Sequence, residues 1–135
     1  MGLVRTALRL SNPARPDLDE IDAVALVDTG ALHLCIPKHV AIQLGLTTPM
    51  EQREVRTADG GRDLVDYVLP IRVSLLGRTC GTGALVMGDE VLLGAIPMED
   101  MDLIVTPAAQ TVARNPESPN IAVSVAKGLP LDPAS

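Results

Sequence analysis

Aromatic side chains are nearly absent from this 135-residue chain, which has no tryptophan, no phenylalanine and a single tyrosine, Tyr67. Proteins that bind single-stranded nucleic acids stack the bases on aromatic rings, and this chain lacks such a platform. Basic residues are also few, with 11 Lys and Arg against 17 Asp and Glu and a formal net charge of -6. A chain this acidic does not attract a polyanion, so we expect no nucleic-acid partner.

Long apolar runs are also missing. No segment reaches membrane-spanning length, and residues 1–10 lack the apolar region and cleavage site of a secretory signal. The opening Met-Gly-Leu-Val-Arg-Thr matches a myristoylation pattern, whereas the alternation of Val4, Thr6, Leu8 and Leu10 is typical of a plain β-strand. We therefore expect no membrane partner.

Cysteine is the third scarce residue type. Cys35 and Cys80 are too few for a disulfide scaffold, and they indicate reduced thiols in a cytoplasmic protein. A disulfide between the two is the alternative.

The residues that are abundant are aliphatic. Hydrophobic residues make up 47% of the chain, and 11 Gly and 11 Pro divide them into short, often β-branched runs. This pattern favours many short strands over a helical bundle. We expect an all-β fold, a closed or nearly closed barrel of six to seven strands with one or two short helices. The expected strands are residues 3–10, 21–27 (buried on both faces), 32–36, 68–76, 79–87, 91–94 and 103–106; the expected helices are residues 37–44, ending at Gly45, and one beginning near Pro97 with Glu99 and Asp100 in its first turn.

A separate hairpin is predicted around the glycine-rich segment Ala58-Asp59-Gly60-Gly61. Its arms, residues 54–57 and 63–67, carry few apolar residues, so we expect the hairpin to project into solvent. Residues 1–113 are expected to form one domain, followed by a tail, residues 114–135, that begins with a segment rich in Asn, Pro and Ser. Residues 121–125 alternate and are a candidate dimer-forming strand, with a tail laid on its own domain as the alternative.

The most informative segment is Ala25-Leu26-Val27-Asp28-Thr29-Gly30-Ala31. A carboxylate follows an apolar strand, where we expect it to lose solvent, and a small hydroxyl residue and a glycine come next. Asp-Thr-Gly alone is weak evidence, because the motif also arises by chance. The evidence is stronger here because Leu92-Leu93-Gly94 follows about sixty residues later, with the hairpin in between. The alternative is a structural Asp28 that accepts hydrogen bonds from nearby backbone N–H groups.

These segments resemble, in order, those of the retropepsin-like (clan AA) aspartic proteases, the single-domain relatives of retroviral protease. The likeness is greatest to short bacterial-type members that carry Leu-Leu-Gly-Ala-Ile-Pro-Met-Glu-Asp-Met-Asp-Leu, which stands here at residues 92–103. The resemblance covers residues 4–112 and implies a closed acid-protease barrel with a flap hairpin. It also implies an aspartic endopeptidase that needs no cofactor and acts on a peptide or protein substrate. Because the chain holds one such motif, a homodimer would supply the second Asp, and the pair would titrate as a unit.

The resemblance assigns roles to ten residues. Asp28 would be the catalytic acid and base, and Thr29 would lock the two active-site loops together across the dimer. Gly30 would offer its backbone to a bound peptide, and Ala31, Leu93 and Gly94 would support the active-site loop. The flap that closes over the substrate would be formed by Ala58, Asp59, Gly60 and Gly61.

Two departures from the viral pattern keep other hypotheses open. Viral members pair an Asp after the motif with an Arg after the second apolar-apolar-Gly, whereas this chain has Leu32 and Ala95. Neither charge is stranded, but the viral mode of stabilising the dimer is missing. The acidic Asp59 at the flap tip is the second departure. An alternative is therefore a non-catalytic dimeric peptide-binding or assembly module, and a further one is a monomeric precursor or inactive form.

His33, Cys35 and His39 are candidate metal ligands by residue type. Residues 33 and 35 share one face of a strand, but His39 lies beyond Pro37 on the predicted helix, and no second cluster completes the site. We expect a buried thiol and two partly exposed histidines, and no metal.

Overall fold

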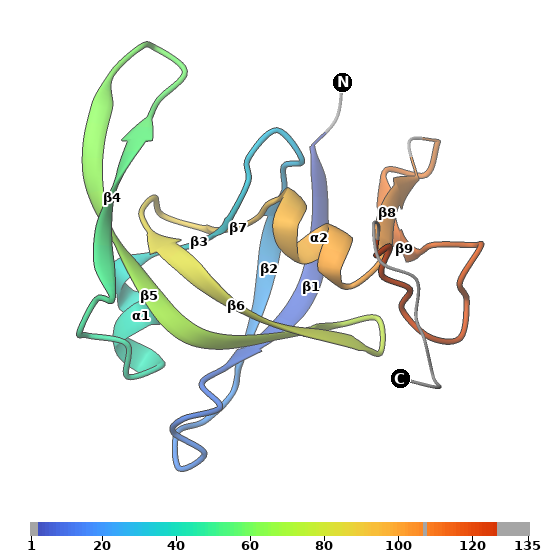
Figure 1. Cartoon of the computed structure of the whole chain (residues 1–135), viewed down its shortest axis with the longest axis horizontal. Helices are drawn as coiled ribbons and strands as arrows, with labels where there is room; N and C mark the ends of the chain where they lie inside the picture. The colour runs from blue at the N-terminus through green and yellow to red at the C-terminus, as the bar shows by residue number, and fades with distance from the viewer. Residues whose placement is uncertain (1–2, 107, 127–135) are drawn as a thin grey trace, which may run out of the picture.

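Nine strands and two short helices make up the described part of the computed structural model, which covers residues 3–106 and 108–126 (Figure 1). In chain order the elements are β1 (Val4–Ser11), β2 (Ile21–Val27), β3 (Leu34–Ile36), α1 (Lys38–Gln43), β4 (Glu51–Arg56), β5 (Arg62–Leu75), β6 (Arg78–Val86), β7 (Val91–Leu93), α2 (Ala95–Asp100), β8 (Leu103–Thr106) and β9 (Thr111–Arg114).

Six of the strands close into a barrel. The order is β1-β2-β7-β3-β6-β5, and β5 pairs back onto β1 through the register Leu10↔Val73. Closure leaves these strands without free edges, while β4 pairs with β5 alone and extends the sheet outside the barrel. The expected all-β barrel is confirmed.

The core is filled almost entirely by aliphatic side chains. Along β1, Leu8 and Leu10 are buried while Arg9 between them is exposed, which follows the two-residue period of a strand. The largest fully buried side chains come from most parts of the barrel and both helix regions, and they are Leu10, Leu34, Ile36, Leu44, Ile71, Leu93, Met101, Val68, Val73 and Pro97.

The prediction that residues 21–27 are buried on both faces is wrong. β2 is buried along one face only, and Val24 on the other face is 60% exposed. The outer face also carries Asp22, which accepts a hydrogen bond from Arg9 on β1 at 2.9 Å. An apolar run can therefore be solvated on one face when no further layer covers the strand.

The projecting hairpin is confirmed. β4 and the first residues of β5 are largely exposed, and they rise together away from the barrel (Figure 1). β5 is one continuous strand where the sequence indicated two, because its first half pairs with β4 and its second half with β6. The ladder with β6 is irregular between Val68 and Ile71, where Pro70 has no N–H to donate.

The bounds of the first helix agree with the prediction, whereas those of the second differ. α1 lies within one residue of its predicted limits, and Gly45 follows its end with a φ of +70°, a conformation that suits glycine. α2 begins at Ala95, immediately after Gly94, instead of near Pro97. Glu99 and Asp100 therefore lie in its last turn, which contradicts the predicted first-turn placement.

A buried arginine fastens the segment after β9 to the barrel. Arg78 lies at the start of β6 and donates to the carbonyls of Met101 (3.2 Å), Asp102 (2.9 Å) and Ser118. The Asp102 carboxylate in turn accepts hydrogen bonds from Ser118, Asn115 and the Val123 backbone N–H.

The tail is thus attached to the domain as far as Val123. Residues 121–125 form no strand within the chain, and their role in a dimer stays a prediction. So does the domain boundary after residue 113. The myristoylation pattern begins at Met1 and Gly2, which lie outside the described residues.

Cys35 and Cys80 are both buried free thiols, which excludes a disulfide between them in this structure. None of the helices in residues 3–106 and 108–126 is both long and apolar enough to cross a membrane.

We expect Arg78→Ala to lower the free energy of unfolding by about 3 kcal/mol, because three backbone carbonyls lose a buried donor and Asp102 loses the cation that lies 3.7 Å away. Urea unfolding would measure this change. Arg72→Ala is the control, since Arg72 is an exposed arginine of β5 and its loss should cost less than about 0.5 kcal/mol. Equal losses in the two variants would contradict this role for Arg78.

Asp102 should make stability depend on pH in acid. Hydrogen bonds from Ser118, Asn115 and the Val123 N–H lower the pKa of Asp102 from 3.8 to about 2. The unfolded state then binds the proton more readily, so this contribution to stability is present above about pH 4 and is lost as the pH falls through about 2.

The variant Asp102→Asn should flatten the unfolding free energy in this window, as measured by urea titrations at several pH values. Asp100→Asn, which changes an exposed carboxylate two residues away, should leave the slope unchanged. The same slope in wild type and Asp102→Asn would refute the assignment.

Candidate active site

Parallel pairing between β2 and β7 brings together two segments that are far apart in the sequence. Leu26 pairs with Leu92 and Val27 with Leu93. The ladder continues one step beyond β2, because the Asp28 N–H donates to the Leu93 carbonyl at 3.0 Å. The two apolar-apolar motifs therefore lie side by side, and the Asp28 loop (residues 28–33) begins where β7 ends.

The Asp28 loop is also bonded to the start of α2. The Ala95 N–H donates to the Ala31 carbonyl at 2.8 Å, and the Ile96 N–H donates to the Leu32 carbonyl at 2.9 Å. Gly94 precedes Ala95 and lies against the backbone of the Asp28 loop. A Cβ on Gly94 would stand 2.9 Å from the Ala31 oxygen and closer still to the His33 oxygen. Glycine is needed here because the two backbones approach too closely for any side chain.

Asp28 stands at the exposed apex of this loop. Asp28, Thr29 and Gly30 are all exposed, so the expectation that Asp28 loses solvent is wrong for the single chain. The reason is topological: β2 is part of the barrel wall, but the loop that follows it leaves the wall at one end. The Asp28 carboxylate accepts a hydrogen bond from the Gly30 N–H at 2.9 Å, and a Cβ on Gly30 would lie 3.1 Å from the same oxygen.

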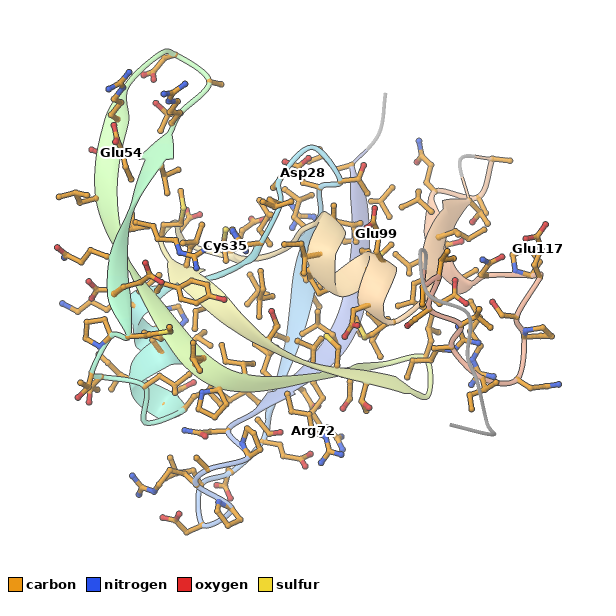
Figure 2. The ribbon with its side chains drawn as sticks, in the orientation of Figure 1. Asp28, Cys35, Glu54, Arg72, Glu99 and Glu117 are labelled. Atoms are coloured by element: carbon orange, nitrogen blue, oxygen red, sulfur yellow. The ribbon has the colours of Figure 1, made fainter. Side chains whose placement is uncertain are left out.

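A cleft of about 600 Å³ separates the Asp28 loop from the projecting hairpin. Figure 2 shows Asp28 at the apex of its loop, Cys35 further down on β3 and Glu54 on the hairpin. The floor is apolar and the hairpin wall is charged. The lining residues are Asp28, Gly30, Ala31, Leu32, His33 and Cys35, then Arg53, Glu54, Val55, Arg56, Thr57 and Ala58, and finally Leu85, Met87 and Leu92.

The predicted flap residues form the tip of the hairpin. Ala58 lines the cleft, whereas Asp59, Gly60 and Gly61 do not. The Asp59 carboxylate accepts hydrogen bonds from the Thr57 hydroxyl and, at 3.0 Å, from the Gly61 N–H. These bonds, the first above all, lower the pKa of Asp59. The charged carboxylate is therefore stabilised by groups of the turn itself.

Arg53, His33 and Tyr67 form a cluster at the cleft, although they are far apart in the sequence. The Arg53 guanidinium lies over the Tyr67 ring, with its Cζ 3.9 Å from the ring centroid, and its Nη1 is 3.2 Å from His33 Nε2. His33 also meets the edge of the Tyr67 ring, at a centroid distance of 5.8 Å. Burial and the nearby Arg53 charge lower the pKa of His33. The sequence offered one signal for this cluster, because Tyr67 is the single aromatic residue of the chain.

The three residues weighed as metal ligands do not come together. His33 and Cys35 line the cleft, while His39 is exposed on α1. Among residues 3–106 and 108–126 no three His, Cys, Asp or Glu side chains are grouped closely enough to hold a metal ion. Burial, followed by the Asp28 charge, raises the pKa of the Cys35 thiol, which favours its neutral form.

Comparison with known proteins gives a family match over part of the chain and a fold. The family model described as "Aspartyl protease" matches residues 15–75, a stretch that contains the Asp28 loop and the whole β4–β5 hairpin. No curated protein matches the chain.

Two solved proteases are similar in structure. The EIAV protease complexed with the inhibitor HBY-793 shares 17% identity, with a TM-score of 0.55, over 73% of this chain and 88% of that one. The Simian Foamy Virus (mac) protease shares 18% identity, with a TM-score of 0.47, over 68% of this chain and 90% of that one. The match over residues 15–75 and the fold likeness to the EIAV protease support a retropepsin-like aspartic protease, a hydrolase of the aspartic peptidase class.

Proposed function

We propose that this chain hydrolyses peptide bonds as a two-fold homodimer, with the Asp28 carboxyls of two copies sharing one proton. The exposure of Asp28 carries the proposal. Acid-protease chemistry needs a second carboxyl about 3 Å away. Of the described cleft residues, the other carboxylate is Glu54, and it pairs with Arg62 on the hairpin at 3.3 Å. A second copy is therefore the source of the partner group.

An apolar patch beside Asp28 supports the same arrangement. Leu32 is 58% exposed and Ile96 is 39% exposed, and the hydrogen bond from the Ile96 N–H to the Leu32 carbonyl makes them neighbours. Burying these side chains against a second copy would stabilise a dimer around the Asp28 loops. Viral proteases have an Asp–Arg pair at the positions of Leu32 and Ala95. In this chain an apolar contact would stabilise the dimer instead.

The proposed reaction needs only the two carboxyls and a water. The ionised Asp28 takes a proton from the water, whose oxygen attacks the peptide carbonyl carbon, and the protonated Asp28 donates its proton to the carbonyl oxygen. The resulting gem-diol collapses as the C–N bond breaks. The amine nitrogen takes the proton held by the first Asp28, and a hydroxyl of the gem-diol returns its proton to the second. The pair ends as it began, with one proton.

The hairpin is the proposed flap. Its cleft-facing stretch, residues 53–58, stands opposite the Asp28 loop, and an extended peptide in the cleft could pair its backbone with the exposed edge of β4. Covering the peptide would exclude bulk water from the two carboxyls. The tip, Ala58 to Gly61, would then close on substrate, with Thr29 and Gly30 at the loop apex below it.

Asp28→Asn should lower kcat/KM on an unfolded protein substrate at mildly acidic pH by about 10²- to 10⁴-fold, because it removes the group that exchanges protons with water. Asp19→Asn, in the exposed loop after β1, is the matched control and should be fully active. Sedimentation of the wild type should give a dimer.

Two outcomes would contradict the proposal. Undiminished hydrolysis by Asp28→Asn would contradict the catalytic role of Asp28. Hydrolysis by a strictly monomeric wild type would contradict the pairing of Asp28 carboxyls from two copies. A wild type that binds peptide as a dimer without cleaving it would favour the non-catalytic module, for which Leu32 and Ala95 are the motivating residues.

Gly94→Ala should lower kcat/KM by about a hundredfold, because its new Cβ pushes the Asp28 loop out of position. Gly81→Ala is the matched control on β6, where a Cβ meets nothing within 4 Å, and we expect it to be fully active. Circular dichroism would verify that both variants are folded. Full activity in Gly94→Ala would show that Leu93 and Gly94 do not brace the active-site loop.

A further inference from the structure

The single tyrosine joins two parts of the molecule that the strand pairing leaves separate. Tyr67 lies on β5 against Gly83 of β6, where a Cβ would stand 2.7 Å from the ring carbon Cε2 and nearer to the hydroxyl. Arg53 reaches the ring from β4, in the part of the hairpin that projects from the barrel. Tyr67 therefore anchors the arginine of the hairpin to the barrel.

Arg53 then reaches across to the Asp28 loop. Its Nη1 lies 3.2 Å from His33 Nε2, while its Nη2 donates to Glu51 at 3.4 Å. Backbone pairing ties β4 to β5 alone, so the described contact between Arg53 and His33 is a side-chain link from the hairpin to the loop that carries Asp28.

This link has a strict protonation requirement. A guanidinium has donors and no acceptor, so His33 Nε2 must be the unprotonated nitrogen of a neutral ring. A proton on Nε2 would turn the hydrogen bond into a contact between two cations.

The groups facing His33 come from several elements. Arg53 of β4, which also pairs with Glu51, and Tyr67 of β5 contact the His33 ring. The charged residues Asp28, Glu54 and Arg56 line the same cleft. The lining contributed by β3, β6 and β7 is uncharged, with Cys35 as its one thiol. The net result of this environment is a lowered pKa of His33, caused first by burial and then by Arg53.

We propose that Arg53, Tyr67 and His33 form a latch that holds the β4–β5 hairpin over the Asp28 loop, and that protonation of His33 opens it. The three are positioning residues. Their effect on catalysis rests on the proposed function, whereas the latch itself is a property of the single chain. As the pH falls below 6.5 and through the lowered pKa of His33, the latch weakens and KM for a peptide rises.

Tyr67 is also the probe for the test, because a chain without tryptophan has tyrosine emission from this ring alone. We expect a sigmoidal change in the emission of the full-length wild type with a midpoint below pH 6.5. His33→Gln keeps an acceptor for Arg53 but cannot take a proton, so its emission should not change in this range. His39→Gln, the matched control at the other histidine, should keep the transition, and so should Glu51→Gln.

An independent measurement does not depend on the folding of a His33 variant. The two histidines give two resolvable ring proton resonances, and titrating them by NMR reports the pKa of each. We expect Arg53→Gln to raise the pKa of His33 toward 6.5, because the variant removes the neighbouring positive charge. In the active enzyme the same variant should raise KM about two- to fivefold, the value of one partly exposed cation–π contact, with kcat unchanged.

The outcomes separate the latch from the protease proposal. A Tyr67 transition that persists in His33→Gln, or a His33 pKa that does not respond to Arg53→Gln, would overturn the latch. An Asp28→Asn protein should still show the Tyr67 transition, because the contacts of Arg53 with His33 and Tyr67 do not involve Asp28. That variant therefore tests the latch even if the wild type proves to have no peptidase activity.

Discussion

The candidate active site depends on one structural constraint, the parallel pairing of β2 with β7. This pairing puts Asp28 beside the residues that follow Leu93, and backbone hydrogen bonds from Asp28, Ala95 and Ile96 then hold the loop on both sides. Gly94 permits the approach because it has no Cβ. A carboxylate at a loop apex would otherwise sample many positions, and acid–base chemistry requires it to occupy one. The rigid barrel supplies that position through the backbone alone.

The same constraint leaves the site open on the side where a second copy is proposed. The barrel strands pack their buried side chains around one core, and the loop that leaves the end of the barrel lies outside that core in residues 3–106 and 108–126. Asp28 is exposed for that reason, and so are Leu32 and Ile96 beside it. In a chain with a single Asp-Thr-Gly motif, the proposed two-fold dimer supplies the second carboxyl. The same apolar patch on each copy then packs against its counterpart.

The hairpin meets opposite requirements if it is the proposed flap, since a flap must leave the barrel and still return to a fixed place over the cleft. Its strand β4 gains little from burial, being paired on one edge and largely exposed. A cation over an aromatic ring and one hydrogen bond to a neutral imidazole hold it with modest energy. Contacts of this strength suit the proposed flap, which would open for each substrate, and the single Tyr of the chain provides one of them.

Local chemistry explains which features the sequence alone determined. Alternating β-branched runs, the stop at Gly45, the glycine-rich hairpin and the Asp-Thr-Gly and Leu-Leu-Gly segments depend on neighbouring residues, and the fold contains them where they were expected. Only the tertiary structure decided the one-sided burial of β2, the start of α2 at Ala95, the burial of Arg78 and the contact of Arg53 with His33. Each of these depends on which layer covers a strand or which distant backbone needs a donor. A linear pattern carries no such information, because solvent exposure and long-range contacts are fixed only when the barrel closes.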